Sequence, residues 1–374
     1  MDGAQILAVI LDLDGTLLDS ERATEGVLKE FLALYGKVLD TEKEEKRLGK
    51  MHRESAASIV VDYDLPMTAE EFSEKIMPLY QERWPEAKAL PGANRLIRHL
   101  HKHAIPLGLA SNSIKKHIER KISYQQGWRE SFSVILGGDE VDHGKPSPDI
   151  FLESAKRMGV DASHCLVIED SLVGVTAAKA AGMKVVVVPS LHAQADHYAE
   201  ASCVLHSLLE FQPDLWGLPS FQDWIENVLP IEPLYVRGLL GEGAPHEASI
   251  LMDKCAENDS FATLPNQVAG VFFGWAKLGT QGIFKVVISI QWDLASSSFK
   301  RLIKACIVSE MLNHTFGEQL LLLVVGYIRK LNEENTEEGA VTNLGATEKD
   351  KGIADTALDQ PMFADHKSDP FLAE

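Results

Sequence analysis

The chain has 374 residues, of which 45% are hydrophobic and 24% charged, and its formal net charge is −19. This length is sufficient for two domains, and the negative charge argues against nucleic acid or an anionic membrane surface as a partner. The four cysteines form no Cys-x-x-Cys pair, which argues against a zinc site or a disulfide framework. Because Asp2 stands where a signal peptide would carry positive charge, and no apolar stretch is long enough to span a membrane, we expect a cytoplasmic location.

The first element is a predicted strand that ends in two acidic residues. Residues 6–11 are apolar, and Asp12, Asp14 and Gly15 follow them. A short aliphatic run that stops at a glycine is typical of a buried parallel strand, and ligands bind at the carboxyl ends of such strands in open α/β sheets. Two carboxylates at one such edge repel each other, and a divalent cation that prefers oxygen ligands, such as Mg²⁺, relieves the repulsion. The sequence therefore predicts a magnesium site here.

The pattern Asp-x-Asp-x-Thr, formed by Asp12, Asp14 and Thr16, resembles the first motif of the haloacid dehalogenase superfamily. The resemblance implies a doubly wound parallel α/β sheet that handles phosphate. It also implies that a phosphate-binding Ser or Thr, a lysine and further acidic residues follow in that order along the chain.

Residues 20–88 have helical patterns and no strand pattern. We expect helices over 21–35, 53–63 and 68–81. Thr68 and Glu71, three residues apart, form the pattern of a capping box. A helical insert directly after the first strand resembles the cap that covers the site in one branch of the superfamily. Gly49 and Lys50 are our candidates for a cap loop that touches the substrate.

The next two motifs supply a small polar pair and a lysine. A strand pattern over 105–110 leads into Ser111 and Asn112, whose hydroxyl and amide groups, ahead of a helix, suit the binding of phosphate. A second strand is predicted over 132–136, and the string Gly-Lys-Pro-Ser-Pro-Asp that follows at 144–149 holds Lys145 between a glycine and a proline. A lysine held in this way is a positioned cation that can neutralise phosphate. Both segments match superfamily motifs.

The fourth motif again places acidic residues at the end of a strand. The apolar run 165–168 leads into Glu169 and Asp170, and a helix rich in small residues follows, with a further buried strand predicted over 185–188. Because the carboxyl ends of parallel strands meet at one edge of a sheet, we expect these carboxylates to complete the magnesium site with Asp12.

The second half of the chain has the composition of a β domain. A proline-rich stretch over 216–233 reads as a linker, and strand patterns follow over 271–277, 282–290 and 320–325. An all-β domain after a phosphatase core resembles the riboflavin kinase barrel. The whole arrangement resembles the family of plant bifunctional riboflavin kinase/FMN phosphatases, nearly from end to end.

The kinase signature of that family is missing from this half. The family has a glycine-rich loop followed by Pro-Thr-Ala-Asn, whereas this chain has Gly241-Glu242-Gly243 and no Pro-Thr-Ala-Asn. Counting back without gaps from Phe316-Gly317-Glu318 puts Lys304 at the family's catalytic Glu, and Glu310 would require a shift. We therefore expect a kinase domain that is retained as structure but is inactive.

The resemblance assigns a role to each matching residue. It implies that Asp12 attacks phosphorus and that Asp14 is the general acid and base. Lys145 is a further catalytic residue by the same resemblance. The implied phosphate-binding residues are Gly15, Thr16, Ser111, Asn112 and Lys145, and the implied Mg²⁺ ligands are Asp12, Asp14, Glu169 and Asp170, with Asp14 acting through its backbone carbonyl.

The sequence predicts a phosphatase domain over 1–215, with its core at 1–19 and 89–215 and its cap at 20–88. A linker over 216–233 and a degenerate riboflavin kinase-like domain over 234–374 follow. The predicted activity is Mg²⁺-dependent hydrolysis of FMN or a related small phosphate ester. A fully bifunctional enzyme, a sugar phosphomutase on the same core, and a non-catalytic flavin- or partner-binding protein are the alternatives.

Overall fold

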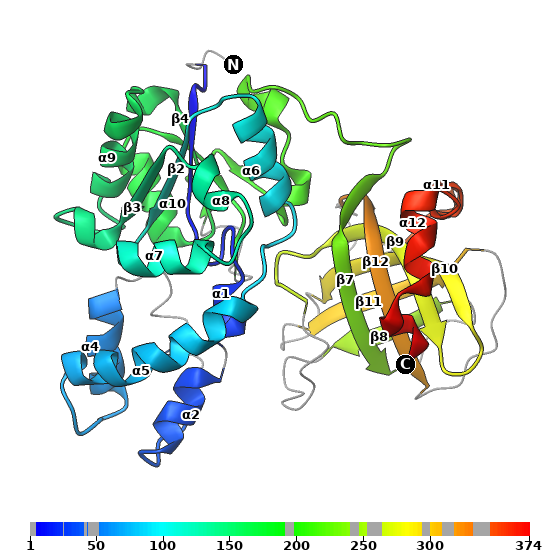
Figure 1. Ribbon diagram of the computed structural model, residues 1–374, viewed down its shortest axis with the longest axis horizontal. Coiled ribbons are helices and arrows are strands. Elements are labelled where there is room, and N and C mark those ends of the chain that lie inside the picture. Colours follow the sequence, from blue (N-terminus) through cyan, green and yellow to red (C-terminus); the bar gives the residue numbers. More distant parts are fainter. Residues whose placement is uncertain are drawn as a thin grey trace, which may run out of the picture. The chain divides into compact units, whose positions relative to one another are not determined.

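A computed structural model describes the chain in two compact units, Met1–Ser220 and Phe221–Glu374, which we treat separately (Figure 1). The described residues are 5–24, 26–40, 43, 52–190, 198–239, 247–252, 264–293, 300–308, 318–331 and 345–374. Within these ranges, no helix is long and apolar enough to cross a membrane.

The first unit is built on a six-stranded parallel sheet of order β3-β2-β1-β4-β5-β6. Its strands are β1 (Ala8–Leu11), β2 (Leu107–Ser111), β3 (Val134–Gly137), β4 (Cys165–Glu169), β5 (Lys184–Val187) and β6 (Cys203–Val204). The sequence predicted the first five of these, with ends that differ by at most two residues. Since β1 lies between β2 and β4, the motifs that follow these three strands meet at one edge of the sheet.

Helices cover both faces of this sheet, which confirms the doubly wound fold (Figure 1). They are α6 (Ala93–Lys102), α7 (Lys115–Ile122), α8 (Trp128–Ser131), α9 (Asp149–Met158) and α10 (Leu172–Ala180). The short 3-10 helices of the core are η2 (Gly138–Glu140), η3 (Ala162–His164), η5 (Leu208–Glu210) and η6 (Pro213–Trp216). Buried residues of the sheet, such as Ile10 and Val167, pack with Ile150 and Val175 of α9 and α10 in one apolar cluster.

The insert after β1 forms a helical cap made of α1 (Ser20–Ala23), α2 (Val27–Ala33), α4 (His52–Asp62), α5 (Ala69–Arg83) and η1 (Trp84–Glu86). Phe31, Ile59 and Phe72 belong to a separate apolar cluster that packs α2, α4 and α5 together. The two chain segments that join cap and core are tied by backbone hydrogen bonds, including Asp19 N–H to Lys88 O at 2.9 Å.

Two predictions for the cap have clear outcomes. The capping box is confirmed, because the Thr68 hydroxyl accepts from the Glu71 N–H and the Glu71 carboxylate accepts from the Thr68 N–H. The single helix predicted over 21–35 is wrong. The structure has α1 and α2 instead, and Gly26 precedes α2 with a φ of 86°, a left-handed conformation that interrupts a helix. Gly49 and Lys50 lie outside the described residues.

The second unit is an antiparallel, barrel-like sheet of order β7-β12-β9-β10-β11-β8. Its strands are β7 (Leu229–Leu239), β8 (Glu247–Met252), β9 (Gly270–Leu278), β10 (Ile283–Asp293), β11 (Lys300–Ile307) and β12 (Gln319–Arg329). β7 begins within the stretch that we expected to be a linker, and its prolines are tolerated because it ends the strand order. The sequence predicted β9, β10 and β12, but it missed β7, β8 and β11.

Helices at the carboxyl end close one face of this sheet. They are α11 (Glu348–Leu358), α12 (Pro361–Ala364), η7 (Asp365–Ser368) and η8 (Pro370–Ala373). The Trp275 indole on β9 donates to the Phe363 carbonyl at 2.9 Å, and both residues belong to the apolar core of the unit. Arg329 at the end of β12 donates to both carboxylate oxygens of Asp350 on α11, at 3.0 and 2.8 Å.

The Asp350 contact generates a prediction about stability. Burial opposes ionisation of this carboxyl, but the hydrogen bonds from Arg329 and Thr347 hold its pKa below the ordinary 3.8. A pKa that is lower in the folded than in the unfolded chain contributes stability that is complete above 3.8 and is lost as the pH falls. We expect Asp350→Asn to destabilise α11 by about 2 kcal/mol at pH 7, and the difference from wild type to narrow below pH 4.

Hydrogen exchange of the α11 amides measures this change locally, which matters because a chain of two units has no single unfolding free energy. The matched control is Glu348→Gln, which breaks the pair with Lys351 at a carboxylate whose side chain is 89% exposed, so we expect an effect within about 0.5 kcal/mol. Equal exchange in Asp350→Asn and wild type would show that this pair does not hold the helix.

Candidate functional site

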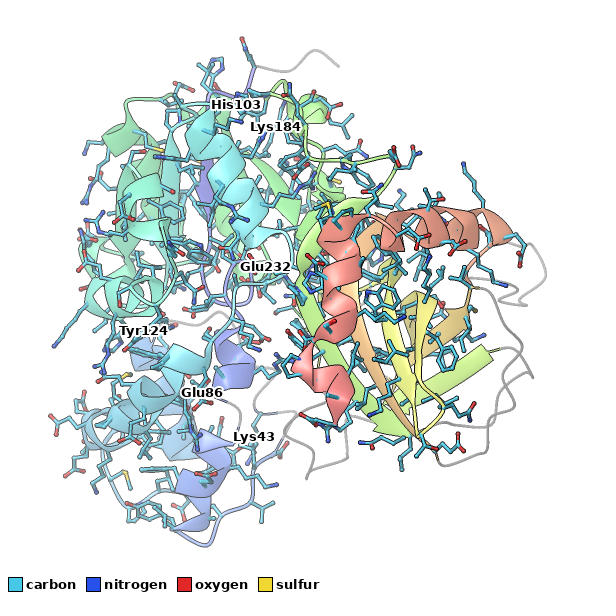
Figure 2. The ribbon with its side chains drawn as sticks, turned by 45° about the vertical axis from the view of Figure 1, so that its right-hand side comes forward. Lys43, Glu86, His103, Tyr124, Lys184 and Glu232 are labelled. Atoms are coloured by element: carbon cyan, nitrogen blue, oxygen red, sulfur yellow. The ribbon has the colours of Figure 1, made fainter. Side chains whose placement is uncertain are left out.

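Three carboxylates meet at the carboxyl ends of β1 and β4. Asp12, Glu169 and Asp170 are buried, and each offers an oxygen within 4.8 Å of the others. The site lies at the edge of the sheet that faces the cap. In Figure 2, Glu86 marks the cap, whereas Lys184, the first residue of β5, marks the opposite edge of the core.

One buried lysine sits among these carboxylates. Lys145 Nζ lies 2.6 Å from Asp12 Oδ1 and 2.5 Å from Glu169 Oε1, and it also donates to the Ala110 carbonyl at 3.0 Å. Burial works against a charged ammonium, but the two carboxylates hold the pKa of Lys145 above its usual value. Burial raises the pKa of Asp12 to about 7, against the opposing effect of Lys145. Among the described residues, one lysine therefore lies in this cluster of three buried carboxyl groups and contacts two of them.

Glu169 is fixed by the protein itself. Its Oε2 accepts hydrogen bonds from the N–H groups of Asp170 and Ser171 and from the Ser171 hydroxyl, at 2.9 to 3.0 Å. A side chain at Gly174 would lie 1.9 Å from the Glu169 carboxylate, so glycine is required there. Lys145 contacts its other oxygen, and Glu169 is still one of the three carboxylates that lie close enough together to share a cation.

Asp170 is held by the first motif. Its Oδ1 accepts from the Thr16 hydroxyl at 3.0 Å, and a Cβ at Gly15, where φ is 85°, would lie 2.4 Å from its Oδ2. Burial, together with the charges of Glu169 and Asp12, raises the pKa of Asp170 well above its ordinary value. A bound cation would stabilise the ionised form of such a buried carboxyl group.

Three of the predicted phosphate-binding residues have other contacts in the structure. The Gly15 N–H donates to the Leu18 carbonyl at 3.0 Å. Both atoms of the Asn112 amide bond the backbone of Lys145, at 2.9 and 3.2 Å, so this side chain positions the lysine loop. The Thr16 hydroxyl contacts Asp170. Ser111 is buried at the end of β2, and its hydroxyl accepts from the Ser113 N–H at 3.1 Å.

Asp14 lies apart from this cluster and has its own three donors. Its Oδ1 accepts from the Ser20 hydroxyl at 2.5 Å and from Lys121 Nζ at 2.7 Å, while its Oδ2 accepts from the Ser113 hydroxyl at 3.0 Å. Burial raises the pKa of this carboxyl, but Lys121 and the hydroxyls outweigh burial and lower it. Sequence reasoning did not select these three residues, because none occupies a motif position that indicates contact with Asp14.

A hollow of about 210 Å³ opens beside Asp14. Ser113 and Lys121 line it from the core, and Tyr80 and Trp84 line it from the cap. Trp84 is almost fully buried, and Lys121 Nζ lies 5.3 Å from the centre of its ring. A molecule in this hollow would rest between a polar wall with one ion pair and an aromatic wall.

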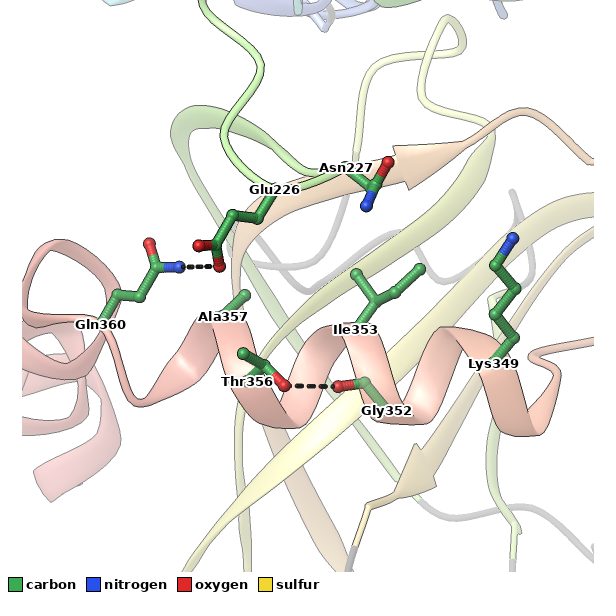
Figure 3. Close-up of a pocket in the computed structure, with 8 residues that line it drawn as sticks. All are labelled: Glu226, Asn227, Lys349, Gly352, Ile353, Thr356, Ala357 and Gln360. Atoms are coloured by element: carbon green, nitrogen blue, oxygen red, sulfur yellow. Dashed lines mark hydrogen bonds between the residues drawn. The ribbon is translucent and has the colours of Figure 1, made fainter.

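A second hollow, of about 320 Å³, lies in the other unit between α11 and the turn at Glu226 (Figure 3). Gln360 bonds the Glu226 carboxylate at 3.0 Å, and the Thr356 hydroxyl donates to the Gly352 carbonyl of its own helix. No nucleophile and base face each other among the residues that line it, so this hollow has no features of a catalytic site.

The fold and the cluster of acids with one lysine define a hydrolase of phosphate monoesters. The family model for haloacid dehalogenase-like hydrolases matches residues 6–182. The chain is 44% identical to the bifunctional riboflavin kinase/FMN phosphatase of Arabidopsis thaliana over 98% of this chain and 97% of that protein. It is 40% identical to a probable pseudouridine-5'-phosphatase of Drosophila melanogaster over 57% of this chain and 95% of that one.

A solved structure of a β-phosphoglucomutase from Clostridium difficile is 26% identical and covers 56% of this chain and 95% of its own, with a TM-score of 0.50. The chain belongs to the haloacid dehalogenase-like hydrolases, in the family that includes the bifunctional riboflavin kinase/FMN phosphatase.

The acid cluster predicts a specific dependence of stability on Mg²⁺. Lys145→Met leaves buried carboxylates without their cation, and breaking a buried pair in this way costs about 3 kcal/mol. We expect the unfolding midpoint of the first unit to fall by about 6–12 °C in the presence of a chelator. Mg²⁺ should recover much of this loss, because a divalent cation supplies the missing charge.

The control for this experiment is Lys156→Met, which removes a lysine whose side chain is 79% exposed and which pairs with Glu153 on the surface. Its midpoint should match wild type under both conditions. An equal fall of the unfolding midpoint of Lys145→Met with and without Mg²⁺ would show that Mg²⁺ does not replace the charge of the lysine.

Proposed function

We propose that the protein is a Mg²⁺-dependent phosphomonoesterase that hydrolyses FMN to riboflavin and phosphate through an aspartyl-phosphate on Asp12. The observation that carries the proposal is the buried cluster of Asp12, Glu169 and Asp170 with a single lysine among them. A buried cluster with more acidic than basic groups suits a divalent cation, and that cation together with Lys145 would attract a dianionic phosphate.

The donor set fits Mg²⁺. Asp12 and Asp170 would hold the ion by their side chains and Asp14 by its backbone carbonyl, with Glu169, which also contacts Lys145, beside them. Carboxylate and carbonyl oxygens are the ligands that Mg²⁺ prefers. When bound, the ion offsets negative charge on the phosphoryl oxygens and on the nucleophile.

The chemistry divides between two aspartates. Asp12 attacks phosphorus, the bond from phosphorus to the leaving oxygen breaks, and Asp14 in its acid form gives that oxygen a proton. An incoming phosphate dianion brings negative charge next to Asp14 and favours this acid form. In the second step Asp14, now a carboxylate, takes a proton from water as the water attacks the aspartyl-phosphate. Riboflavin and inorganic phosphate are released, and both aspartates return to their starting states.

We assign Lys145 and Ser111 to binding the phosphoryl group during its transfer. The lysine is held by Asn112 and Glu169, so its ammonium has one position. A fixed cation stabilises the developing charge without reorganising during the reaction. Ser111 reaches the same edge from the end of β2.

FMN is the proposed substrate because the similarity to the Arabidopsis bifunctional enzyme extends over nearly the whole chain, whereas the pseudouridine-5'-phosphatase relative matches only part of it. The aromatic wall of the hollow at Tyr80 and Trp84 supports a flat leaving group. A sugar phosphomutase is the second candidate, favoured by the likeness to the phosphoglucomutase structure. A mutase would also have to bind the second phosphate of a bisphosphate. Lys121, which lines the described part of the hollow, is already paired with Asp14, and this counts against such a role for it.

We propose further that the second unit does not phosphorylate riboflavin. A kinase needs a cradle for phosphates, ligands for its metal and a base near the hydroxyl. The sequence has no Pro-Thr-Ala-Asn, and Lys304 occupies the position that the gapless count assigns to the base. Lys304 lies within β11, paired with Ser289 of β10 and Ser249 of β8. Residues 241–243, Glu310 and 316–317 lie outside the described residues.

The phosphatase proposal predicts that Asp12→Asn abolishes phosphate release from FMN while the fold is retained. An amide cannot form the acyl-phosphate, so we expect a loss of at least about 10⁴-fold. Phosphate release should be measured with Mg²⁺ and with a chelator on FMN and a panel of sugar phosphates. FMN hydrolysis without a bisphosphate activator supports the phosphatase, whereas turnover of a sugar phosphate only when its bisphosphate is present would favour the mutase. Full activity in Asp12→Asn would refute the mechanism.

The kinase proposal predicts no FMN from riboflavin and Mg-ATP. The test uses the full-length Asp12→Asn protein, in which phosphatase activity cannot consume the product. The Arabidopsis bifunctional enzyme, assayed in parallel, shows that the conditions detect a kinase. Sustained formation of FMN by the Asp12→Asn protein would overturn the proposal and restore a bifunctional enzyme.

A further inference from the structure

Lys121 is a buried lysine with no place in the motifs of the site. It lies on α7, its side chain is 9% exposed, and its Nζ is 2.7 Å from Asp14 Oδ1. Lysines are rarely buried unless they are paired, and the partner here is the carboxyl that the proposed mechanism uses as acid and base. The position of this lysine therefore bears on how that carboxyl is oriented.

The two oxygens of Asp14 have different surroundings. Among the described residues, Oδ1 accepts from both Ser20 and Lys121, while Oδ2 accepts from Ser113 alone. Both lone-pair directions of Oδ1 are thus occupied, by an ammonium and a hydroxyl, whereas Oδ2 has one hydroxyl partner and is the less crowded oxygen. Oδ2 is therefore the oxygen that is available to a leaving group in the adjoining hollow.

We propose that Lys121 is a positioning residue that holds Asp14 by Oδ1, so that Oδ2 exchanges the proton with the leaving oxygen and with water. This rests on the proposed phosphatase function. In the first step the bond from phosphorus to the leaving oxygen breaks, a bond from phosphorus to Asp12 forms, and the Asp14 proton moves from Oδ2 to the leaving oxygen. The carboxylate that results has the Lys121 ammonium beside it.

The three contacts of Asp14 come from different parts of the unit, which explains why a lysine is needed. Ser20 begins the first helix of the cap, and a serine hydroxyl can rotate to other acceptors. Lys121 is carried by α7, which Ile118 and Ile122 anchor in the core, and its ammonium lies near the Trp84 ring. A charged donor fixed to the core defines the direction of the carboxylate more strongly than a neutral hydroxyl does.

The test compares two kinds of ester on Lys121→Met. An alkyl phosphate releases an alkoxide that must be protonated, whereas p-nitrophenyl phosphate releases a stable phenolate that needs no proton. We measure kcat/KM, because it reports on the steps up to the first phosphoryl transfer. We expect kcat/KM for the alkyl ester to fall about 100-fold, a typical share for general acid catalysis, and that for p-nitrophenyl phosphate to fall less than about fivefold.

The ratio of kcat/KM for the alkyl ester to kcat/KM for p-nitrophenyl phosphate is measured on one preparation of each variant. A partly unfolded sample lowers both constants equally and leaves this ratio unchanged. Lys116→Met is the matched control, since Lys116 is an exposed lysine on the same helix, and its ratio should equal that of wild type. Lys121→Arg keeps a charged donor, so its kcat/KM for the alkyl ester should be at least about tenfold higher than that of Lys121→Met.

Equal losses for both esters in Lys121→Met, no loss for either, or no recovery in Lys121→Arg would each overturn the positioning role. FMN is used as the alkyl ester if the wild-type protein hydrolyses it. If it does not, glycerol 3-phosphate is used instead. A failure of FMN as substrate is thus seen in the wild-type protein and does not affect the comparison of the variants.

Discussion

The bridge that Lys145 makes between Asp12 and Glu169 is the interaction on which the rest of the site depends. Three carboxyl groups are buried at one edge of the sheet, and without a cation they would be protonated or the site would be destabilised. The lysine is held at its backbone by Asn112 and at its ammonium by Glu169. Its charge offsets only part of the acidity, and we expect the remaining negative charge to favour a divalent cation at this site.

The parallel sheet brings these groups together because its strand order places β1 between β2 and β4. Backbone conformation then sets the distances within the site. Gly15 and Gly174 are both required because a Cβ at either position would collide with Asp170 or Glu169. Asp14, the proposed acid and base, is held separately, by Ser20 at the start of α1, Ser113 after β2 and Lys121 on α7. The proposed nucleophile and the proposed proton donor thus have independent supports, and we infer that this lets each keep its own charge state.

The sequence was most informative where chemistry follows a strand. Asp12, Ser111, Lys145 and Glu169 were selected because each stands at or just after the end of a strand or before a helix, and the structure places all four at one edge of the sheet. Lys121 could not be selected in this way. It faces Asp14 only through the packing of α7, a relation between residues more than 100 positions apart that leaves no local pattern.

Similar reasons explain the errors elsewhere. The helix predicted over 21–35 is interrupted at Gly26, which has a left-handed conformation. The spacing of apolar residues gives no indication of this conformation. The contact of the Asn112 amide with the Lys145 backbone was likewise not predicted, because the fold brings these distant residues together. In the second unit, β11 carries Lys300, Arg301 and Lys304, which weaken an alternating apolar pattern. Its pairing with β10 comes from tertiary structure.

The central claim is that Asp12 carries the phosphoryl group during turnover, and chemical trapping of the intermediate tests it most directly. Wild-type protein is mixed with FMN and Mg²⁺, quenched in acid during turnover, reduced with borohydride and digested for mass spectrometry. An acyl-phosphate is reduced to an alcohol, so the account predicts homoserine at position 12 in the FMN sample and aspartate there in the sample without substrate. Unmodified Asp12 in a sample that was turning over FMN when quenched, or reduction at a different carboxylate, would contradict it.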